Sequence, residues 1–330
     1  MCAAGGKIDV MLVVDGSASI GQPAFQTALD SLARLVGIFD LQEANVGMVT
    51  YSTTVTGLIP LVNNFTTARL QEAIQKTPYP NQSTNTYIGM MGAIEEFRNL
   101  SETRAERGVP RLLVVLTDGC HIQGPDPGIA ALEAAKEGIT TCAFGIGDDI
   151  DDAELLRIAN NKSDYKFWTD SYYSLQQQIV LIARRVKTIP QMLKMGFETS
   201  DTLKEADEKR FYRLKVSKRG TTIRLLDVRG ESSGYWTYAD ERPSSALYDG
   251  VIYEGDTFIP PPQPVPGDRE DTISSSSMSD LKIAIESIEP DSCLSMWSLE
   301  GDATGSTAVN RDFACFGHVV VYIFAAVLLK

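Results

Sequence analysis

Short apolar runs alternate with amphipathic stretches between residues 7 and 188 of this chain. Ile8–Val14 is apolar apart from Asp9, and Leu112–Leu116 is a second run of the same kind. Strands that are apolar on both sides occur in parallel sheets, where helices cover both faces. Phe25–Phe39, by contrast, places its apolar residues on one side of a helix. The alternation therefore predicts an α/β fold, with a doubly wound, mostly parallel sheet and helices on both of its faces.

One pair of strands in this region is predicted to run antiparallel. Val46–Tyr51 and Val55–Val62 are separated only by a short Ser-Thr-Thr turn, whereas a parallel connection needs a long crossover. We expect this pair at one edge of a six-stranded sheet. The other predicted elements are helices Thr67–Gln75, Ile88–Leu100, Ile129–Glu137, Asp152–Asn160 and Leu175–Val186, and strands Thr140–Gly145 and Tyr165–Thr169.

The chain divides into four parts by pattern and composition. Residues 1–189 hold the α/β pattern, and residues 190–259 hold short alternating segments that predict a small β-rich, sandwich-like domain. Residues 260–312 begin with Pro-Pro-Pro-Gln-Pro-Val-Pro and contain a run of serines, so we expect a mostly disordered linker there. Residues 313–330 form a hydrophobic tail. The alternating segments are Phe211–Val216, Thr222–Val228, Tyr235–Tyr238 and Leu247–Tyr253.

The net charge of the chain is −13, and no run of basic residues offsets it. Nucleic acids and anionic membrane surfaces are bound by basic patches, so the charge argues against both as partners. The five cysteines, Cys2, Cys120, Cys142, Cys293 and Cys315, form no C-x-x-C pair and hence no zinc motif. Cys142 lies inside an apolar strand and is expected to pack in the core, while the disulfide pairing stays open.

Side chains with oxygen donors follow the predicted strands. Asp15, Ser17 and Ser19 come directly after the first buried strand. Thr84 lies in a polar loop before a predicted helix, and Asp118 follows a second buried strand. A parallel sheet gathers its binding loops at the carboxyl ends of its strands, so we expect these five side chains to converge. Two carboxylates and three hydroxyls suit Mg²⁺, Mn²⁺ or, less well, Ca²⁺, and they suit zinc and copper poorly.

The charge of this predicted site determines what else it can bind. Two carboxylates against a doubly charged cation leave a roughly neutral centre with an open coordination position. These loops supply no third carboxylate, so an Asp or Glu of a partner protein is the natural missing ligand. Tyr87, His121 and Gln123 are the candidates for the surrounding ligand-binding face. The alternative interpretation is that the Asp and Ser side chains only cap helices.

The α/β region resembles a von Willebrand factor type A domain, such as the inserted domains of integrins. Asp15, Ser17 and Ser19 match the Asp-x-Ser-x-Ser motif of that family. Thr84 matches the first threonine of its Thr-x-Thr motif, and Asp118 matches the aspartate of its Thr-Asp-Gly motif. The resemblance implies a metal-ion-dependent adhesion site (MIDAS), in which the two aspartates act partly through water. It also implies a change of shape at the last helix of the domain, which accompanies ligand binding in some members.

Other functions remain open at this stage. A Ser-His-Asp hydrolase needs a histidine as its base, and the chain has only His121 and His318. No Gly-x-x-x-x-Gly-Lys-Ser/Thr phosphate loop is present either, so the chain is predicted not to be an enzyme. The main alternative is an intracellular type A module that scaffolds a multiprotein, ATPase-linked complex. A binding module that has lost its metal is a further one.

The glycosylation candidates and the hydrophobic tail favour an extracellular, surface-attached adhesion protein with a protein or matrix ligand. The apolar run Val319–Leu329 is too short to span about 30 Å of hydrocarbon. It suits the removable tail of a glycosylphosphatidylinositol signal, although a truncated transmembrane helix is the alternative.

No signal peptide precedes the first strand, so either the native start is missing or the protein is cytosolic. The candidate glycosylation sites, all of the form N-x-S/T, are Asn64, Asn81, Asn99 and Asn161.

Overall fold

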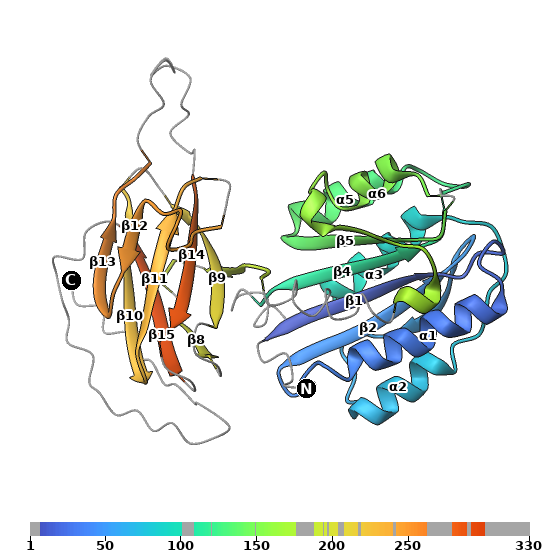
Figure 1. Cartoon of the computed structure of the whole chain (residues 1–330), viewed down its shortest axis with the longest axis horizontal. Helices are drawn as coiled ribbons and strands as arrows, with labels where there is room; N and C mark the ends of the chain where they lie inside the picture. Colours follow the sequence, from blue (N-terminus) through green and yellow to red (C-terminus); the bar gives the residue numbers. More distant parts are fainter. Residues whose placement is uncertain are drawn as a thin grey trace, which may run out of the picture.

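The computed structural model of this chain contains two units, an α/β unit and a β-sandwich, which lie side by side (Figure 1). The predicted helix Leu175–Val186, apart from its first residue, and the hydrophobic tail lie outside the described residues. The structure describes residues 7–100, 109–119, 121–148, 150–175, 188–193, 195–196, 198–203, 208–216, 219–239, 242–262, 279–288 and 292–300.

The α/β unit is built on a six-stranded sheet with the order β3-β2-β1-β4-β5-β6. Neighbouring strands run parallel from β2 to β6, and β3 pairs antiparallel with β2 at one edge. This order confirms the predicted sheet and its antiparallel edge strand. The strands are β1 (Ile8–Asp15), β2 (Ala44–Tyr51), β3 (Val55–Ile59), β4 (Arg111–Thr117), β5 (Ile139–Ile146) and β6 (Lys166–Thr169).

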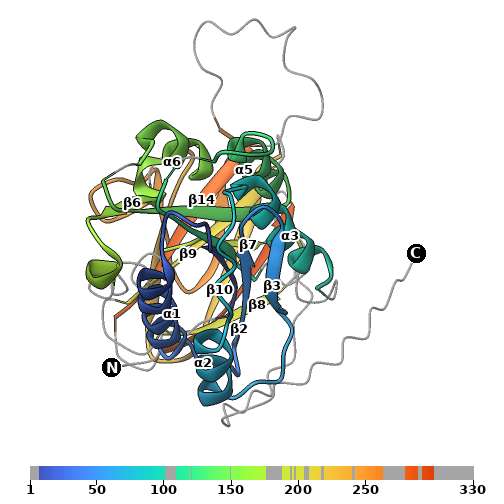
Figure 2. The same cartoon turned by 90° about the vertical axis from the view of Figure 1, so that its right-hand side faces the viewer.

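Helices cover both faces of this sheet. α1 packs against α2, whereas α3 packs against α5, which in turn contacts α6. Figure 2 shows α1 and α3 on opposite sides of the strands. No helix in the described part of the chain is long and apolar enough to cross a bilayer. The helices are α1 (Gln22–Val36), α2 (Thr67–Gln75), α3 (Thr86–Arg98), α5 (Pro127–Lys136) and α6 (Asp152–Ile158).

Capping side chains determine where several of these helices begin. The side chain of Asn85 accepts a hydrogen bond from the backbone N–H of Ile88 at 3.2 Å. For this reason α3 begins at Thr86, two residues before the predicted start. Asp126 and Asp151 cap α5 and α6 in the same way. A cap also pins the loop that precedes its helix, and the loop before α3 carries one of the candidate metal ligands.

The strands at the centre of the sheet are buried along their length. All eight residues of β1 are buried, and in β4 only Arg111 is partly exposed. Cys142 of β5 is a buried free cysteine in the core, as predicted. Asp9, the one charged residue of the first strand before its end, is buried and accepts a hydrogen bond from Asn45 Nδ2 at 2.9 Å. The sheet is therefore a rigid frame, and the loops at its carboxyl edge are held at fixed positions.

The second unit is a sandwich of two sheets. One sheet has the order β13-β10-β15-β8, and the other has the order β12-β11-β14-β9-β7. Their inner faces share an apolar core that includes Leu214, Ile223, Ile283 and Leu294. The strands are β7 (Gln191–Leu193), β8 (Glu198–Leu203), β9 (Lys209–Val216), β10 (Thr221–Arg229), β11 (Ser232–Thr237), β12 (Gly250–Ile252), β13 (Gly255–Ile259), β14 (Ser279–Ser287) and β15 (Ser292–Glu300).

The prediction of a linker over residues 260–312 is wrong for its central part. β14 pairs with β9 and β11, and β15 pairs with β8 and β10, so both are interior strands of the sandwich. Leu281, Ile283 and Ile285 alternate along β14 and are buried. Apolar residues at every second position are typical of a strand with one buried face, and they form one here even though the flanking sequence is rich in Pro and Ser. The β-rich unit therefore extends to residue 300, and residues 263–278 and 301–312 lie outside the described part of the chain.

Candidate metal-binding site

Neighbouring strands bring the two candidate aspartates to one edge of the sheet. β1 and β4 run parallel and in register, with Val14 opposite Leu116. Asp15 is the last residue of β1, and Asp118 follows directly after the end of β4. Because the carboxyl ends of the two strands coincide, both carboxylates lie at the edge where binding loops gather in such sheets.

A chain of hydrogen bonds links four of the candidate ligands. The backbone N–H of Ser17 donates to Oδ1 of Asp15 at 2.8 Å. The hydroxyl oxygens of Ser17 and Ser19 lie 3.1 Å apart. Ser19 Oγ donates in turn to Oδ1 of Asp118, also at 3.1 Å. The alternating Asp-x-Ser-x-Ser residues thus present their oxygens on one side, toward the second aspartate.

The loop after β1 is tied to the loop before α3. The N–H of Ala18 donates to the carbonyl of Gln82 at 2.8 Å, and the N–H of Asn81 donates to the carbonyl of Gly16 at 3.0 Å. Only glycine fits at position 16, because a Cβ there would lie 2.5 Å from Cδ of Pro80. Direct packing of the two loops brings the candidate threonine toward the serines.

Thr84 also anchors the loop that follows β4. Its carbonyl accepts hydrogen bonds from the N–H groups of Ile122 and Gln123 at 2.9 and 3.0 Å. Thr84 itself is buried, so this contact is shielded from water. Three loops, from β1, from β4 and from the start of α3, are therefore joined before any ligand is considered.

The candidate ligands share one pocket of about 790 Å³. Ser19, Thr84 and Asp118 line it, and the buried Asp15 and Ser17 connect to it through Ser19. The described residues contain no group of three or more His, Cys, Asp or Glu side chains that could hold a metal. Any cation bound here therefore depends on the hydroxyl oxygens as well as on the two carboxylates.

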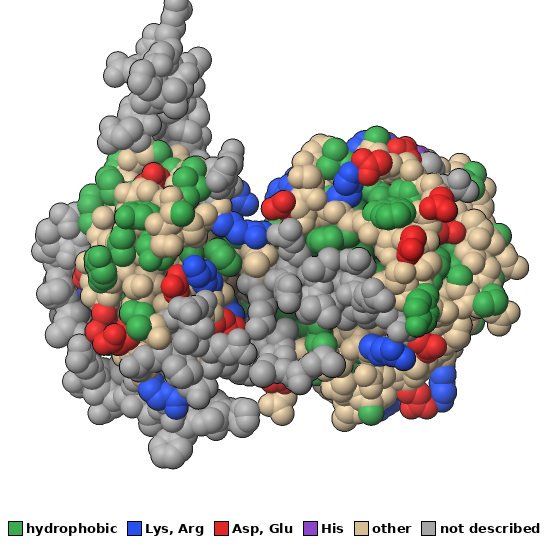
Figure 3. All heavy atoms as spheres, viewed as in Figure 1, with side chains coloured by type: hydrophobic (Ala, Val, Ile, Leu, Met, Phe, Trp, Pro, Cys, Tyr) green, Lys and Arg blue, Asp and Glu red, His purple; other side chains and the backbone are tan. Residues whose placement is uncertain are grey.

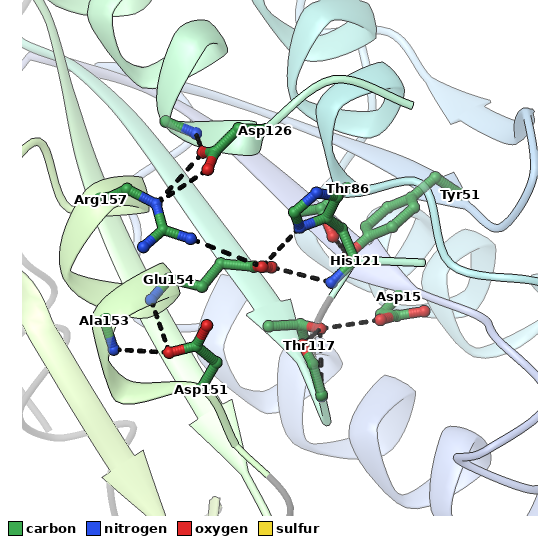
Figure 4. Close-up of polar contacts among 12 residues, drawn as sticks. Asp15, Tyr51, Thr86, Thr117, His121, Asp126, Asp151, Ala153, Glu154 and Arg157 are labelled. Atoms are coloured by element: carbon green, nitrogen blue, oxygen red, sulfur yellow. Dashed lines mark hydrogen bonds and ion pairs between the residues drawn. The ribbon is translucent and has the colours of Figure 1, made fainter. Parts of the chain in front are cut away.

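A layer of polar residues behind the pocket holds Asp15 (Figure 4). Thr117 Oγ1 donates to Asp15 Oδ2 at 2.9 Å, and the Tyr51 hydroxyl donates to Oγ1 of Thr86 at 3.2 Å. Burial, and then the charge of Asp15, raise the pKa of Tyr51 well above its usual value, so this hydroxyl stays a neutral donor. Thr117, Tyr51 and Thr86 were not among the site residues predicted from the sequence.

Burial makes ionisation of the two carboxylates less favourable than it is in water. Burial raises the pKa of Asp15 to about 6; the charge of Asp118 also raises it, while hydrogen bonds from Ser17 and Thr117 lower it. Burial raises the pKa of Asp118 as well. Neither carboxylate forms an ion pair with any described residue. Since a nearby positive charge favours the ionised form of an acid, the pair fits a bound cation.

The three residues expected on the ligand-binding face lie outside the lining of this pocket. His121 is held by Glu154, which accepts the backbone N–H of His121 at 3.0 Å and lies 2.5 Å from its Nδ1 (Figure 4). Tyr87 packs against the core of the α/β unit, and Gln123 is exposed. His121 therefore anchors its own loop, and Gln123 is the most accessible of the three.

The pocket is completed by residues that the sequence analysis did not single out. Tyr172 lies close enough to the two aspartates that burial, and then the charges of Asp118 and Asp15, raise its pKa. Ile122 and Tyr173 are 74% and 73% exposed beside the pocket. Their position after β4 and β6, at the carboxyl edge of the sheet, is the signal that could have indicated them. The lining residues that were not among the predicted site residues are Ile20, Ala24, Thr27, Gly119, Ile122, Ile146, Gly147, Asp148, Asp170, Ser171, Tyr172 and Tyr173.

The four candidate glycosylation sites are all exposed: Asn64, Asn81, Asn99 and Asn161. Asn81 and Asn161 have positive φ angles of 54° and 59°, a conformation that asparagine tolerates better than most residues. Accessibility is compatible with glycosylation, which stays a prediction.

Fold and site together define an α/β domain that gathers carboxylate and hydroxyl oxygens at the carboxyl edge of its sheet. Residues 9–180 match the von Willebrand factor type A domain, and the chain belongs to that family.

Relatives of this chain include extracellular matrix proteins. Matrilin-4 of Homo sapiens is 30% identical over 165 residues, which cover 48% of this chain and 26% of that protein. The collagen alpha-4(VI) chain of Mus musculus is 27% identical over 209 residues, which cover 60% of this chain and 9% of that one. The chain thus spans about a quarter of the length of Matrilin-4 and less of the collagen.

Solved structures show the same fold. Proximal thread matrix protein 1 from the mussel byssus has a TM-score of 0.50 and 22% identity, covering 62% of this chain and 50% of that chain. A structure of the same mussel protein with a zinc-occupied MIDAS motif has a TM-score of 0.50 and 24% identity. The match covers 56% of this chain and 47% of that chain. At these sequence identities, the similarity shows that the fold is shared.

Proposed function

We propose that this protein is an extracellular adhesion protein whose α/β domain binds a protein or matrix ligand through a divalent cation. One observation carries the proposal. A chain of hydrogen bonds runs from Asp15 through Ser17 and Ser19 to Asp118, and Thr84 lines the same pocket. These residues come from three loops that are tied together by backbone hydrogen bonds.

The donor set supports Mg²⁺ or Mn²⁺ as the cation, with Ca²⁺ as the weaker choice. All five candidate side chains offer hard oxygen atoms, and none offers nitrogen or sulfur. The mussel protein with a zinc-occupied MIDAS motif supports a divalent cation at the corresponding place. The raised pKa values of both aspartates support this fit, because a nearby cation favours the ionised form of a buried acid.

Each residue has a proposed role. Ser17, Ser19 and Thr84 would contribute neutral hydroxyl oxygens, and Asp15 and Asp118 would balance the charge, partly through water as the family resemblance implies. When bound, the cation supplies a positive centre that can accept one further anionic oxygen. An Asp or Glu carboxylate of the ligand is the group we propose for that position.

A single carboxylate cannot distinguish one protein ligand from another, so the surface around the pocket must contribute to specificity. Ile122 and Tyr173 provide exposed apolar area directly beside the pocket. Gln123 is exposed in the same loop as Ile122, and it remains a proposed contact together with His121 and Tyr87. Large exposed apolar side chains next to a polar centre are typical of protein interaction sites.

The proposed location is outside the cell, at the surface or in the matrix. The matrilin and collagen relatives support this location, and so do four exposed glycosylation candidates. Attachment through a lipid anchor that replaces the removable hydrophobic tail is part of the proposal. We also propose that the site is not catalytic, because His121, the one histidine in the described residues, lies outside the lining of the pocket.

Calorimetric titration of the EDTA-treated full chain with MgCl₂ and MnCl₂ tests the proposal. Ser17→Ala should abolish cation binding, whereas the control Ser31→Ala, which removes a buried hydroxyl of α1, should leave it unchanged. The chain is then used to capture matrix proteins with and without EDTA. Capture that is equally strong in EDTA, or equal cation affinity of both variants, would refute the mechanism.

A further inference from the structure

A basic patch crosses the boundary between the two units. Arg213 and Lys215 of β9 point out of the sandwich, because the residues that alternate with them are buried. Lys282 of β14 lies directly opposite Arg213 in the strand pairing. Arg242 precedes β12 in the sandwich, and Lys162 follows α6 in the α/β unit. Figure 3 shows Lys and Arg side chains on the sandwich side of the notch that separates the two units.

Arg242 connects the two units at this patch. Its Nη2 donates to the hydroxyl of Tyr165 in the α/β unit at 3.2 Å. Its guanidinium lies 5.7 Å from the centre of the Phe211 ring on β9. Lys162 Nζ lies 5.8 Å from the centre of the Tyr165 ring. One cation from each unit therefore contacts Tyr165.

One carboxylate neutralises the strand part of the patch. Asp280 Oδ2 accepts from Arg213 Nη2 at 2.7 Å, and Asp280 Oδ1 lies 2.6 Å from Lys215 Nζ. Burial tends to raise the pKa of Asp280, but the hydrogen bond from Lys215 and the charges of Arg213 and Lys282 outweigh it, so the pKa lies below its usual value. Asp280 is thus shared among several cations.

Lys162 and Arg242 differ from Arg213 and Lys215, which pair with Asp280. Within the described residues, neither Lys162 nor Arg242 forms an ion pair with a carboxylate. The buried Nε of Arg213 has no acceptor there either. Burial, and then the charges of Arg213 and Arg242, lower the pKa of Lys162. The patch therefore concentrates positive charge, although the chain as a whole carries −13.

We propose that this patch binds the sulfate groups of an anionic polysaccharide, at a site separate from the candidate metal site. Arg and Lys are the side chains that recognise sulfate and phosphate groups by charge-assisted hydrogen bonds. Alternate residues on one face of a strand are about 7 Å apart, and neighbouring strands are about 5 Å apart. The cations of the patch therefore cover a wider area than a single sulfate or phosphate ion can contact. A polymer with several sulfate groups matches this spread, and a free phosphate does not.

The test is a calorimetric titration of the full chain with a heparin-derived hexasaccharide, in low salt and with EDTA present. We expect binding that weakens as NaCl is added, because salt screens exposed charges. The double variant Lys162→Gln/Arg242→Gln should lose roughly ten-fold or more in affinity, since it removes two direct charge contacts. Neither residue pairs with a described carboxylate, so the substitutions leave no such acid unpaired.

The matched control is Lys76→Gln/Lys136→Gln, which removes the same charge from exposed positions at the C-terminal ends of α2 and α5. It should bind the hexasaccharide as the unmodified chain does. Inorganic sulfate and phosphate, titrated separately, should bind far more weakly than the hexasaccharide. Absence of binding in low salt, equal loss in both double variants, or phosphate binding as tight as that of the hexasaccharide would each overturn the proposal. If the first double variant does not fold, Lys162→Gln alone gives the same comparison against Lys76→Gln.

Discussion

Thr117 donates a hydrogen bond from Oγ1 to Oδ2 of Asp15 at 2.9 Å and thereby joins the end of β4 to the end of β1. The other oxygen of the same carboxylate accepts the backbone N–H of Ser17. With both oxygens held, the Asp15 carboxylate is oriented before any cation binds. Thr117 directly precedes Asp118, so one residue positions a candidate ligand and the next residue supplies another.

Thr117→Val should therefore weaken Mg²⁺ binding while the fold is kept. Valine has the shape of threonine but lacks the hydroxyl, so Oδ2 of Asp15 loses a donor inside the protein. Loss of this hydrogen bond should lower the free energy of unfolding by about 1 kcal/mol. Calorimetric titration with MgCl₂ and chemical denaturation measure the two effects.

Thr141→Val on the neighbouring strand β5 is the matched control. Thr141 is buried, and its hydroxyl has no partner among the described residues. The same substitution there should leave Mg²⁺ affinity unchanged and should not destabilise the protein. If both variants lose Mg²⁺ affinity equally, the role assigned to Thr117 is wrong.

Removal of the cation should lower the thermal stability of the protein. A ligand that binds only the folded state at a hundred times its Kd stabilises by about 2.7 kcal/mol, so the midpoint of thermal unfolding should fall on addition of EDTA. Asp118→Asn should make the midpoint insensitive to Mg²⁺. In EDTA this variant should be at least as stable as the unmodified chain, because burial disfavours the Asp118 charge.

The control for this comparison is Asp30→Asn, which removes a carboxylate from the exposed side of α1. It should keep the full response to Mg²⁺. A variant with asparagine at position 118 that still responds to Mg²⁺ as strongly as the control would show that the ion binds elsewhere.

Glu154→Ala should destabilise the loop that follows β4. Glu154 is buried and accepts two hydrogen bonds from His121, one from the backbone and one from the ring. Removing Glu154 leaves the backbone N–H of His121 without its acceptor, so we expect a loss of about 1–3 kcal/mol in the free energy of unfolding. Mg²⁺ affinity should also fall, since this loop begins at Asp118.

Glu133→Ala provides the contrast, because its contacts with Arg98 and Lys136 are on the surface. Exposed ion pairs contribute about 1 kcal/mol at most. Chemical denaturation of both variants measures the difference. Similar, small losses for the two variants would mean that Glu154 does not hold the loop.

Asp280→Asn should destabilise the sandwich in a way that depends on pH. The surrounding cations hold the pKa of Asp280 below its usual value, so its charge stabilises the folded state above that value. This contribution is lost as the pH falls through the lowered pKa. We expect Asp280→Asn to cost about 1.5–3 kcal/mol at neutral pH and progressively less in strong acid, since hydrogen bonds to a charged group contribute about that much.

Asp152→Asn is the control, because this aspartate is 77% exposed in its ion pair with Lys166. It should have little effect at either pH. Denaturation curves at neutral and acidic pH compare the variants, and a cost of Asp280→Asn that does not change with pH would contradict the shared role of this carboxylate.

Much of the α/β unit could be predicted from local patterns. Buried parallel strands are apolar on both sides, and β1 and β4 could be recognised because of this. Asp15 and Asp118 could be placed together because the ends of adjacent parallel strands coincide. β14 was missed because a window rich in Pro and Ser hid its alternating apolar residues.

The order of residues along the chain determined the apolar periodicity, the oxygen donors that follow the strands, and hence the type of fold and the candidate ligands. Only the tertiary structure decided which side chains support them, because Thr117 meets Asp15, and Tyr51 meets Thr86, through packing between separate elements. The same holds for the basic patch, whose cations range from Lys162 to Lys282 and form no run in the sequence. Electrostatic energy depends on distance in space, and the pairing of β9 with β14, together with the contact between the units, determines those distances.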